Sequence, residues 1–182
     1  MLSSGKRFRP VPPVKFPSRD HAVLRPTRME EHMVKPVPDG YHTLTPYFVV
    51  PDGESMLRFL QEAFGAKILF RHDRPDGALM HAELELGDSK VMVGQANEQF
   101  TPRSQMTYVY VPDVDAAYKR AIAAGGRSLK EVADQFYGDR SGGFEDPAGN
   151  CWWVATHVED VSEAELTRRV QAQERSAENN AA

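Results

Sequence analysis

Apolar and polar positions follow the same pattern in two stretches of the chain, Thr45–Gly65 and Met106–Gly126. Each stretch opens with a run of apolar, β-branched and aromatic residues that is typical of a strand. A Pro-Asp pair breaks the run, and apolar residues then recur at helical spacing until a glycine. The two stretches are identical at six of their 21 positions. The pattern therefore predicts a repeated strand–turn–helix unit.

The two predicted helices carry matching signals at both ends. Asp52 and Asp113 stand where an N-cap residue is expected, because a short acidic side chain accepts hydrogen bonds from the first helical N–H groups. Gly65 and the pair Gly125-Gly126 suit a left-handed C-terminal cap. The apolar residues at helical spacing are Met56, Phe59, Leu60, Ala63 and Phe64 in the first helix and Ala117, Ala121 and Ile122 in the second.

Three strand-like stretches follow each helix, so each half of the repeat is expected to have the order β-α-β-β-β. Asp76-Gly77 and Gly87-Asp88 supply turns in the first half, and Tyr137–Gly143 and Asp146–Asn150 are expected to be turns in the second. The predicted strands are Lys67–His72, Leu79–Leu86 and Lys90–Gly94 in the first half, and Ser128–Val132, Gly143–Glu145 and Cys151–Thr156 in the second.

We expect the chain to have three parts. Residues 1–40 hold 7 of the 13 prolines and carry 8 Lys and Arg against 4 Asp and Glu, which indicates a basic arm that is extended or disordered. Residues 41–160 form the domain, with modules at about 41–100 and 101–160, and residues 161–182 form a C-terminal helix and a frayed tail. That helix is predicted from Ser162, in a capping box with Glu165, to about Glu174. Met33 is an alternative start of the protein.

Composition narrows the possible classes of function. No apolar run approaches the roughly 18–20 residues that cross a bilayer, so we expect no membrane partner. A net charge of −4 gives no electrostatic footprint for nucleic acid. The single cysteine, Cys151, excludes an internal disulfide framework and favours a cytoplasmic location.

Several ordered motifs resemble one protein family. The segments TPYFVV near the first strand, LMHAELELGDSKVMV at Leu79–Val93 and DQFYGDRSGGFEDPAGNCWWVATHVEDVS at Asp134–Ser162 are similar to the PhnB-like branch of the vicinal-oxygen-chelate superfamily. This superfamily comprises glyoxalase, bleomycin-resistance and dioxygenase proteins. The resemblance implies an α+β fold of two tandem βαβββ modules, which form half-barrels around a shared small-molecule pocket. It also implies a homodimer.

Strand alternation indicates which side chains face that pocket. On Leu79–Leu86, the apolar set Met80, Ala82, Leu84 and Leu86 is expected to pack under the first helix. His81 and Glu83 then point to the pocket, because a carboxylate left in an apolar core would be costly. The residues predicted to bind a ligand are Tyr47, Tyr108, Tyr110, Arg140 and Trp153.

The resemblance also bears on metal binding. Metal-dependent members of the superfamily place His, Gln or Glu at three strand positions that correspond here to Thr45, Met106 and Trp153. None of these three is a competent ligand for a first-row divalent metal, so we predict no cofactor. The alternative is a displaced divalent metal held by His81, Glu83 and His157.

Two main classes of function remain open from the sequence, beside a weaker third, an interaction protein recruited by the basic arm of residues 1–40. The first is a binding protein without the usual metal, which holds a small, partly aromatic or anionic molecule, with Arg140 as the anion receptor. The second is a lyase, isomerase or dioxygenase-type enzyme in which His81, Glu83 and Tyr137 are the catalytic candidates. A competing interpretation of Arg140 is an ion pair with Asp139.

Overall fold

The computed structural model describes residues 34–181 and the side chains of residues 34–176. Most of the arm predicted for residues 1–40 therefore lies outside the described residues. In the described part, strands and helices alternate in the order that the repeat predicts. The elements are β1 (Tyr47–Val50), α1 (Gly53–Phe64), β2 (Lys67–Asp73), β3 (Leu79–Leu86), β4 (Ser89–Gln95), β5 (Met106–Tyr110), α2 (Val114–Ala123), β6 (Arg127–Asp134), β7 (Asp139–Glu145), β8 (Cys151–His157) and α3 (Glu163–Ala181).

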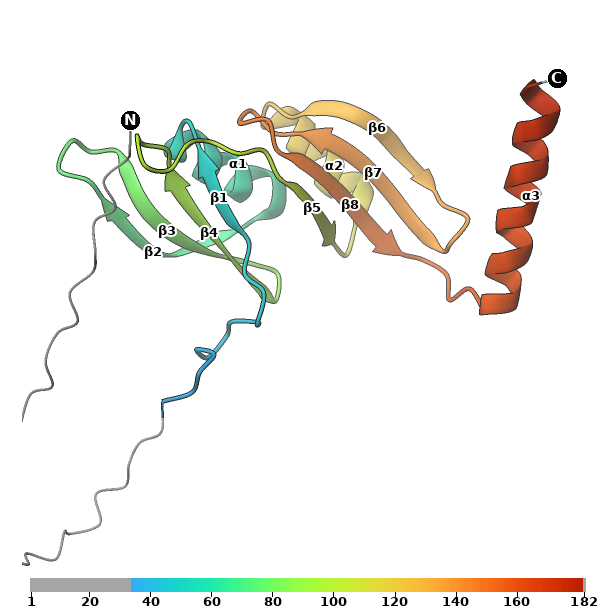
Figure 1. Cartoon of the computed structure of the whole chain (residues 1–182), viewed down its shortest axis with the longest axis horizontal. Coiled ribbons are helices and arrows are strands. Elements are labelled where there is room, and N and C mark those ends of the chain that lie inside the picture. The colour runs from blue at the N-terminus through green and yellow to red at the C-terminus, as the bar shows by residue number, and fades with distance from the viewer. Residues whose placement is uncertain (1–33, 182) are drawn as a thin grey trace, which may run out of the picture. The chain divides into compact units, whose positions relative to one another are not determined.

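The strands form two sheets of four with equivalent topology, in the orders β1-β4-β3-β2 and β5-β8-β7-β6. In each sheet the first strand of the module pairs in parallel with its last strand, and the remaining pairs are antiparallel. Helix α1 packs on the first sheet and α2 on the second, and the two helices contact each other (Figure 1). The chain therefore has the α+β fold of two βαβββ modules.

The predicted helix caps are confirmed. The Asp52 side chain accepts a hydrogen bond from the Ser55 N–H at 3.2 Å, and Asp113 accepts from the Ala116 N–H at 2.9 Å. Gly65 ends α1 with φ of 69°, a left-handed conformation that costs a glycine little. These local signals set where each helix leaves its sheet.

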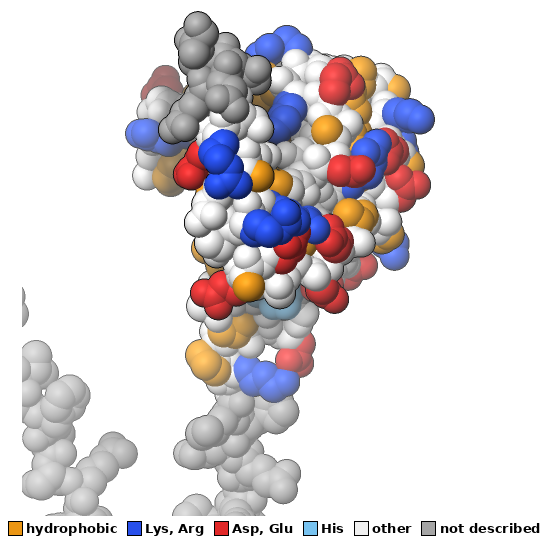
Figure 2. Space-filling view, turned by 90° about the vertical axis from the view of Figure 1, so that its right-hand side faces the viewer, with side chains coloured by type: hydrophobic (Ala, Val, Ile, Leu, Met, Phe, Trp, Pro, Cys, Tyr) orange, Lys and Arg blue, Asp and Glu red, His pale blue; other side chains and the backbone are white. Residues whose placement is uncertain are grey.

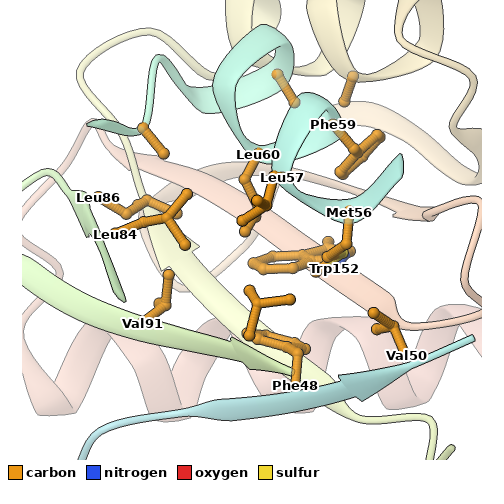
Figure 3. Packing of buried hydrophobic residues seen from close by; sticks show 14 of the residues in the cluster. Phe48, Val50, Met56, Leu57, Phe59, Leu60, Leu84, Leu86, Val91 and Trp152 are labelled. Carbon is orange, nitrogen blue, oxygen red and sulfur yellow. The ribbon is translucent and has the colours of Figure 1, made fainter. Parts of the chain in front are cut away.

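One hydrophobic core serves both modules. Phe48 of β1 stacks on Trp152 of β8 with ring centroids 5.1 Å apart, and Leu57 and Phe59 of α1 lie in the same cluster (Figure 3). Trp152 is fully buried, and its indole N–H donates to the Asp146 carboxylate at 2.9 Å. Because this cluster draws on both sheets, each module's sheet is packed on the helix side and turns its other face outward.

The main differences from the sequence prediction are one side-chain face and two element boundaries. Met80 was expected under α1, but a bulge between β2 and β3 places Leu79 in the core and leaves Met80 55% exposed on the opposite face. Strand β7 begins at Asp139, whereas Tyr137–Gly143 was expected to be a turn; Gly142 and Gly143 masked the strand pattern. Helix α3 runs on to Ala181, past the predicted end.

The part of the surface seen in Figure 2 carries Lys and Arg side chains interspersed with Asp and Glu. No helix in residues 34–181 is long and apolar enough to span a membrane.

Candidate functional site

The first sheet carries a pocket of about 550 Å³ on the face that points away from α1. Tyr47 of β1, His81 of β3 and Val49 contribute to its walls, together with the bulged Met80 and with Phe100 from the loop after β4. The bulge supplies Met80 to the lining, because it turns that side chain to the pocket face. The result is a largely apolar hollow with a few polar groups, which is the usual make-up of a small-molecule site.

A glycine on the neighbouring strand sets the position of Tyr47. A Cβ atom on Gly94 of β4 would lie 2.8 Å from the Tyr47 hydroxyl oxygen, so only glycine leaves room for the phenol ring. The Tyr47 hydroxyl lies 3.2 Å from Nδ1 of His81. Burial raises the pKa of Tyr47, and its hydroxyl therefore stays protonated at neutral pH.

Tyr47 and His81 begin a chain of hydrogen bonds that ends outside the pocket. His81 Nε2 lies 3.3 Å from the Glu83 carboxylate, and Tyr41 donates its hydroxyl to the same carboxylate. The hydrogen bond from Tyr41 is the main cause that lowers the pKa of Glu83, and in return it raises the pKa of Tyr41 to about 12. Because the carboxylate accepts, a neutral His81 carries its proton on Nε2 and its Nδ1 accepts from Tyr47.

The pocket rim after β4 is shaped by Asn97. Its side-chain oxygen accepts hydrogen bonds from the N–H groups of Gln99 and Phe100 at 2.9 and 2.8 Å. These bonds form a tight local turn that sets Phe100 against the pocket, where its side chain is 57% exposed. Sequence reasoning missed Phe100, although the Asn97 turn signal was present.

The second sheet presents an exposed aromatic face. Tyr108 and Tyr110 of β5 lie on the side away from α2, with ring centroids 5.3 Å apart, and Tyr110 is 63% exposed. Trp153 of β8 lies over Gly143, whose Cβ would meet the indole ring at 3.2 Å. Tyr137 is also exposed and follows Phe136 in the turn before β7.

A buried carboxylate holds this face together. Asp139, at the start of β7, accepts hydrogen bonds from the hydroxyls of Tyr110 at 2.9 Å and Tyr108 at 3.4 Å. Its other oxygen lies 2.8 Å from Nδ1 of His157, whose Nε2 is 3.0 Å from Asp160. These two carboxylates raise the pKa of His157, Asp139 contributing most. Burial and a hydrogen bond with Tyr137 raise the pKa of Tyr108.

Arg140 is engaged within the chain. Its guanidinium makes two hydrogen bonds of 2.7 and 2.8 Å with the Asp115 carboxylate and a third of 3.0 Å with Asp134. It does not pair with Asp139, which its strand turns to the other face. Asp115 is held ionised, because the hydrogen bond from Arg140 lowers its pKa. The arrangement gives Arg140 a clear part in joining α2 to β7.

The residues predicted to share one pocket divide between two sheet faces. The first-sheet pocket contains Tyr47 and His81, whereas Tyr108, Tyr110 and Trp153 lie on the second sheet. Tyr108 and Tyr110 border a different hollow, of about 620 Å³, between β5 and the segment before β1. Sequence periodicity assigned the faces of Tyr47 and His81 correctly and that of Met80 wrongly, and it does not say which faces meet.

The residues do not fit the metal site of the superfamily's metal-dependent members. The corresponding positions hold a hydroxyl, a thioether and an indole, on Thr45, Met106 and Trp153. Within residues 34–181 no group of three or more His, Cys, Asp and Glu side chains is placed to hold an ion. Of the displaced set, His81 and Glu83 lie on β3 of the first sheet and His157 on β8 of the second.

Comparison with known families and sequences gives one family and several relatives. Residues 41–154 match the family described as the Glyoxalase/Bleomycin resistance protein/Dioxygenase superfamily. Uncharacterised proteins of Mycobacterium bovis and Mycobacterium tuberculosis H37Rv are each 33% identical to the chain over 141 residues. The match covers 71% of this chain, 93% of the M. bovis protein and 83% of the M. tuberculosis protein.

Solved structures show the same fold. TioX from Micromonospora sp. ML1 is 26% identical, with a TM-score of 0.56 over 63% of this chain and 98% of TioX. A glyoxalase/bleomycin resistance protein/dioxygenase family enzyme from Burkholderia phytofirmans PsJN is 20% identical, with a TM-score of 0.52 over 65% of this chain and 98% of that protein. The second likeness concerns the fold alone.

Proposed function

Because the chain belongs to the Glyoxalase/Bleomycin resistance protein/Dioxygenase superfamily, we propose that it binds a small, partly aromatic molecule in the first-sheet pocket without the usual metal of the superfamily. The observation that carries the proposal is the pocket itself, with apolar walls and with polar groups at Tyr47 and His81. Tyr47 offers a ring for stacking, and Met80 an adaptable apolar wall.

Homodimerisation is part of the proposal. The face of the second sheet carries large exposed side chains, among them Met106 at 73% and Tyr110 at 63% exposed. Exposed apolar faces of this kind are typical of interaction sites. We infer that the second sheet of a partner copy covers the first-sheet pocket, which would unite the residues that the sequence assigned to one site. Sedimentation velocity tests this: a monomer at micromolar concentration would argue against it.

A second candidate function is acid–base catalysis in the same pocket. The hydrogen-bonded chain from Tyr47 through His81 and Glu83 to Tyr41 favours it, since such a chain can hold or move a proton beside a bound ligand. In an enzyme, His81→Gln would abolish turnover of a bound compound while leaving its affinity nearly unchanged. If turnover and affinity fall by the same factor, His81 contributes to binding and not to catalysis.

Two finer assignments complete the proposal. The motifs at Leu79–Val93 and Asp134–Ser162 favour the PhnB-like branch of the superfamily. The single cysteine, half-buried Cys151, suits a reducing compartment, so we propose a cytoplasmic location, which cell fractionation would test.

The binding proposal is tested by placing a charge in the pocket wall. Met80→Lys should lower the affinity for a small aromatic ligand found by fragment screening by about tenfold or more, because a ligand that covers residue 80 would then bury an ammonium in place of making an apolar contact. Leu129→Lys is the matched control, since Leu129 is an exposed apolar residue of β6 outside the pocket lining. Equal affinity of the wild type and both variants, measured by isothermal titration calorimetry, would remove the pocket from the function.

A further inference from the structure

We propose that Arg74 forms an anion-binding subsite at the rim of the first-sheet pocket, which selects ligands that carry a carboxylate on an apolar or aromatic body. The inference rests on the proposed small-molecule pocket and names the class of ligand that it takes. Arg74 then replaces Arg140 as the proposed anion receptor, because Arg140 already donates hydrogen bonds to two carboxylates of the chain.

Arg74 is fixed between the β2–β3 hairpin and the end of β4. Its backbone N–H donates to the Ala78 carbonyl at 2.8 Å, and its own carbonyl accepts from the Gly77 N–H at 2.9 Å. One terminal nitrogen of the guanidinium reaches the Ala96 carbonyl at 3.5 Å. Ala96 lies between Gln95 and Asn97, both of which line the pocket. The terminal nitrogen therefore lies next to the rim segment 95–97, although Arg74 is not itself among the residues that line the pocket.

The guanidinium has unused hydrogen-bonding capacity. The Arg74 Nε atom is shielded from solvent and has no hydrogen-bond acceptor among the described residues. Arg71, Arg140 and Arg169, by contrast, each pair with two carboxylates. A buried donor without an acceptor destabilises the folded state, and more so when it is charged. An anion from outside the chain would satisfy it once the guanidinium turns toward the pocket, and would match the planar fork of donors.

Two neighbouring amides make the rim rich in donors. The Gln95 side-chain oxygen accepts from the Gly53 N–H at 3.3 Å, and the Asn97 side-chain oxygen accepts from two backbone N–H groups. With both oxygens engaged, each amide has its NH₂ group left to offer. No described residue of the pocket lining carries a carboxylate. A rim of donors around an apolar hollow is complementary to a ligand whose polar end only accepts, which is the case for a carboxylate.

Paired probes test the subsite. Benzoate, 2-naphthoate and indole-3-acetate are titrated by isothermal titration calorimetry against their primary amides, which have nearly the same shape but no charge. We expect the wild type to prefer the carboxylates by about tenfold or more, as a charge-assisted bidentate contact provides. Arg74→Gln should bring each carboxylate close to its amide and leave the amides unchanged, and Arg74→Lys should keep part of the preference.

Arg140→Gln is the matched control, because it removes a guanidinium that the chain itself satisfies. It should leave the preference for carboxylates intact, and circular dichroism verifies that both glutamine variants fold. If Arg74→Gln still prefers carboxylates over amides as strongly as the wild type, the proposed subsite is wrong, although the pocket proposal is unaffected. If no probe binds, or if binding is insensitive to Met80→Lys, the proposed pocket fails and the subsite fails with it.

Discussion

At the scale of single residues, glycines place the aromatic side chains that face away from the helices. Tyr47 fits over Gly94 in the first sheet and Trp153 over Gly143 in the second. A side chain at either glycine would force the ring to shift, because the Cβ would come within 2.8 Å of the Tyr47 hydroxyl or 3.2 Å of the indole. The two modules thus use one device, an aromatic residue packed on a glycine of the adjacent strand.

His157 makes stability depend on pH. Hydrogen bonds with Asp139 and then Asp160 raise its pKa in the folded protein above the value of about 6.5 that a histidine has in an unfolded chain. The stabilisation by these bonds is therefore complete below about pH 6.5 and is lost as the pH rises through the folded-state pKa. We expect the Tm to fall over that range, and to fall less in His157→Gln.

His72→Gln provides the control for this measurement, since His72 is an exposed residue of β2. Its pH profile of Tm, recorded by differential scanning fluorimetry, should match that of the wild type. A wild-type profile that coincides with that of His157→Gln would show that the Asp139–His157 contact does not stabilise the fold.

The alternation of side chains along the strands placed two residues of the candidate site. Tyr47 and His81 were placed on the pocket face by strand alternation, and the structure puts both in the pocket lining. Arg74 was missed, because its Nε atom is left without a hydrogen-bond acceptor among residues 34–176 only by the folded arrangement. Arg140 was predicted to be the anion receptor, yet Asp115, distant in sequence, lies against it.

At the scale of elements, local signals predicted helices better than strands. The caps at Asp52 and Asp113 and the stop at Gly65 are all where the sequence placed them. The bulge at Met80 could not be predicted, because it arises from the register between β2 and β3 rather than from either strand alone. The start of β7 at Asp139 was not predicted, because Gly142 and Gly143, which pack closely against neighbouring side chains, interrupt the strand-like pattern of the sequence.

Gly138 ties the end of the second module to the segment before α3. Its φ is 98°, and a Cβ there would overlap the carbonyl oxygen of Glu159. Its own carbonyl accepts from the N–H groups of Val158 and Glu159. We expect Gly138→Ala to lower the free energy of unfolding by roughly 3 kcal/mol or more, because left-handed backbone strain and a steric overlap add.

Gly77→Ala separates these two effects. Gly77 also has a positive φ, of 84°, but a Cβ there would meet nothing within 4 Å. It should therefore cost only the backbone strain, about 1 kcal/mol. Urea denaturation of both variants measures the difference. Equal losses of unfolding free energy would mean that the Glu159 backbone moves away from the added methyl group at no energetic cost.

At the scale of the whole molecule, the described chain has one core and two outward sheet faces. The stacking of Phe48 on Trp152 and the contact between α1 and α2 join the modules on the helix side. The sequence repeat predicted both modules but not this division. Whether two faces meet depends on the packing of the modules and on a second copy, and neither is encoded in the periodicity of a strand.

The most direct test of the central claim is a methyl NMR titration of the full chain labelled at its methionines, with the aromatic carboxylates as ligands. Met80 lines the pocket, Met56 is buried in the core and Met106 lies exposed on the second sheet. The account predicts that the Met80 methyl signal shifts and saturates with ligand concentration while the Met56 signal stays unchanged. If a partner copy closes the pocket, the Met106 signal should shift as well, with the same dissociation constant. A Met80 signal that stays fixed at saturating ligand would contradict it.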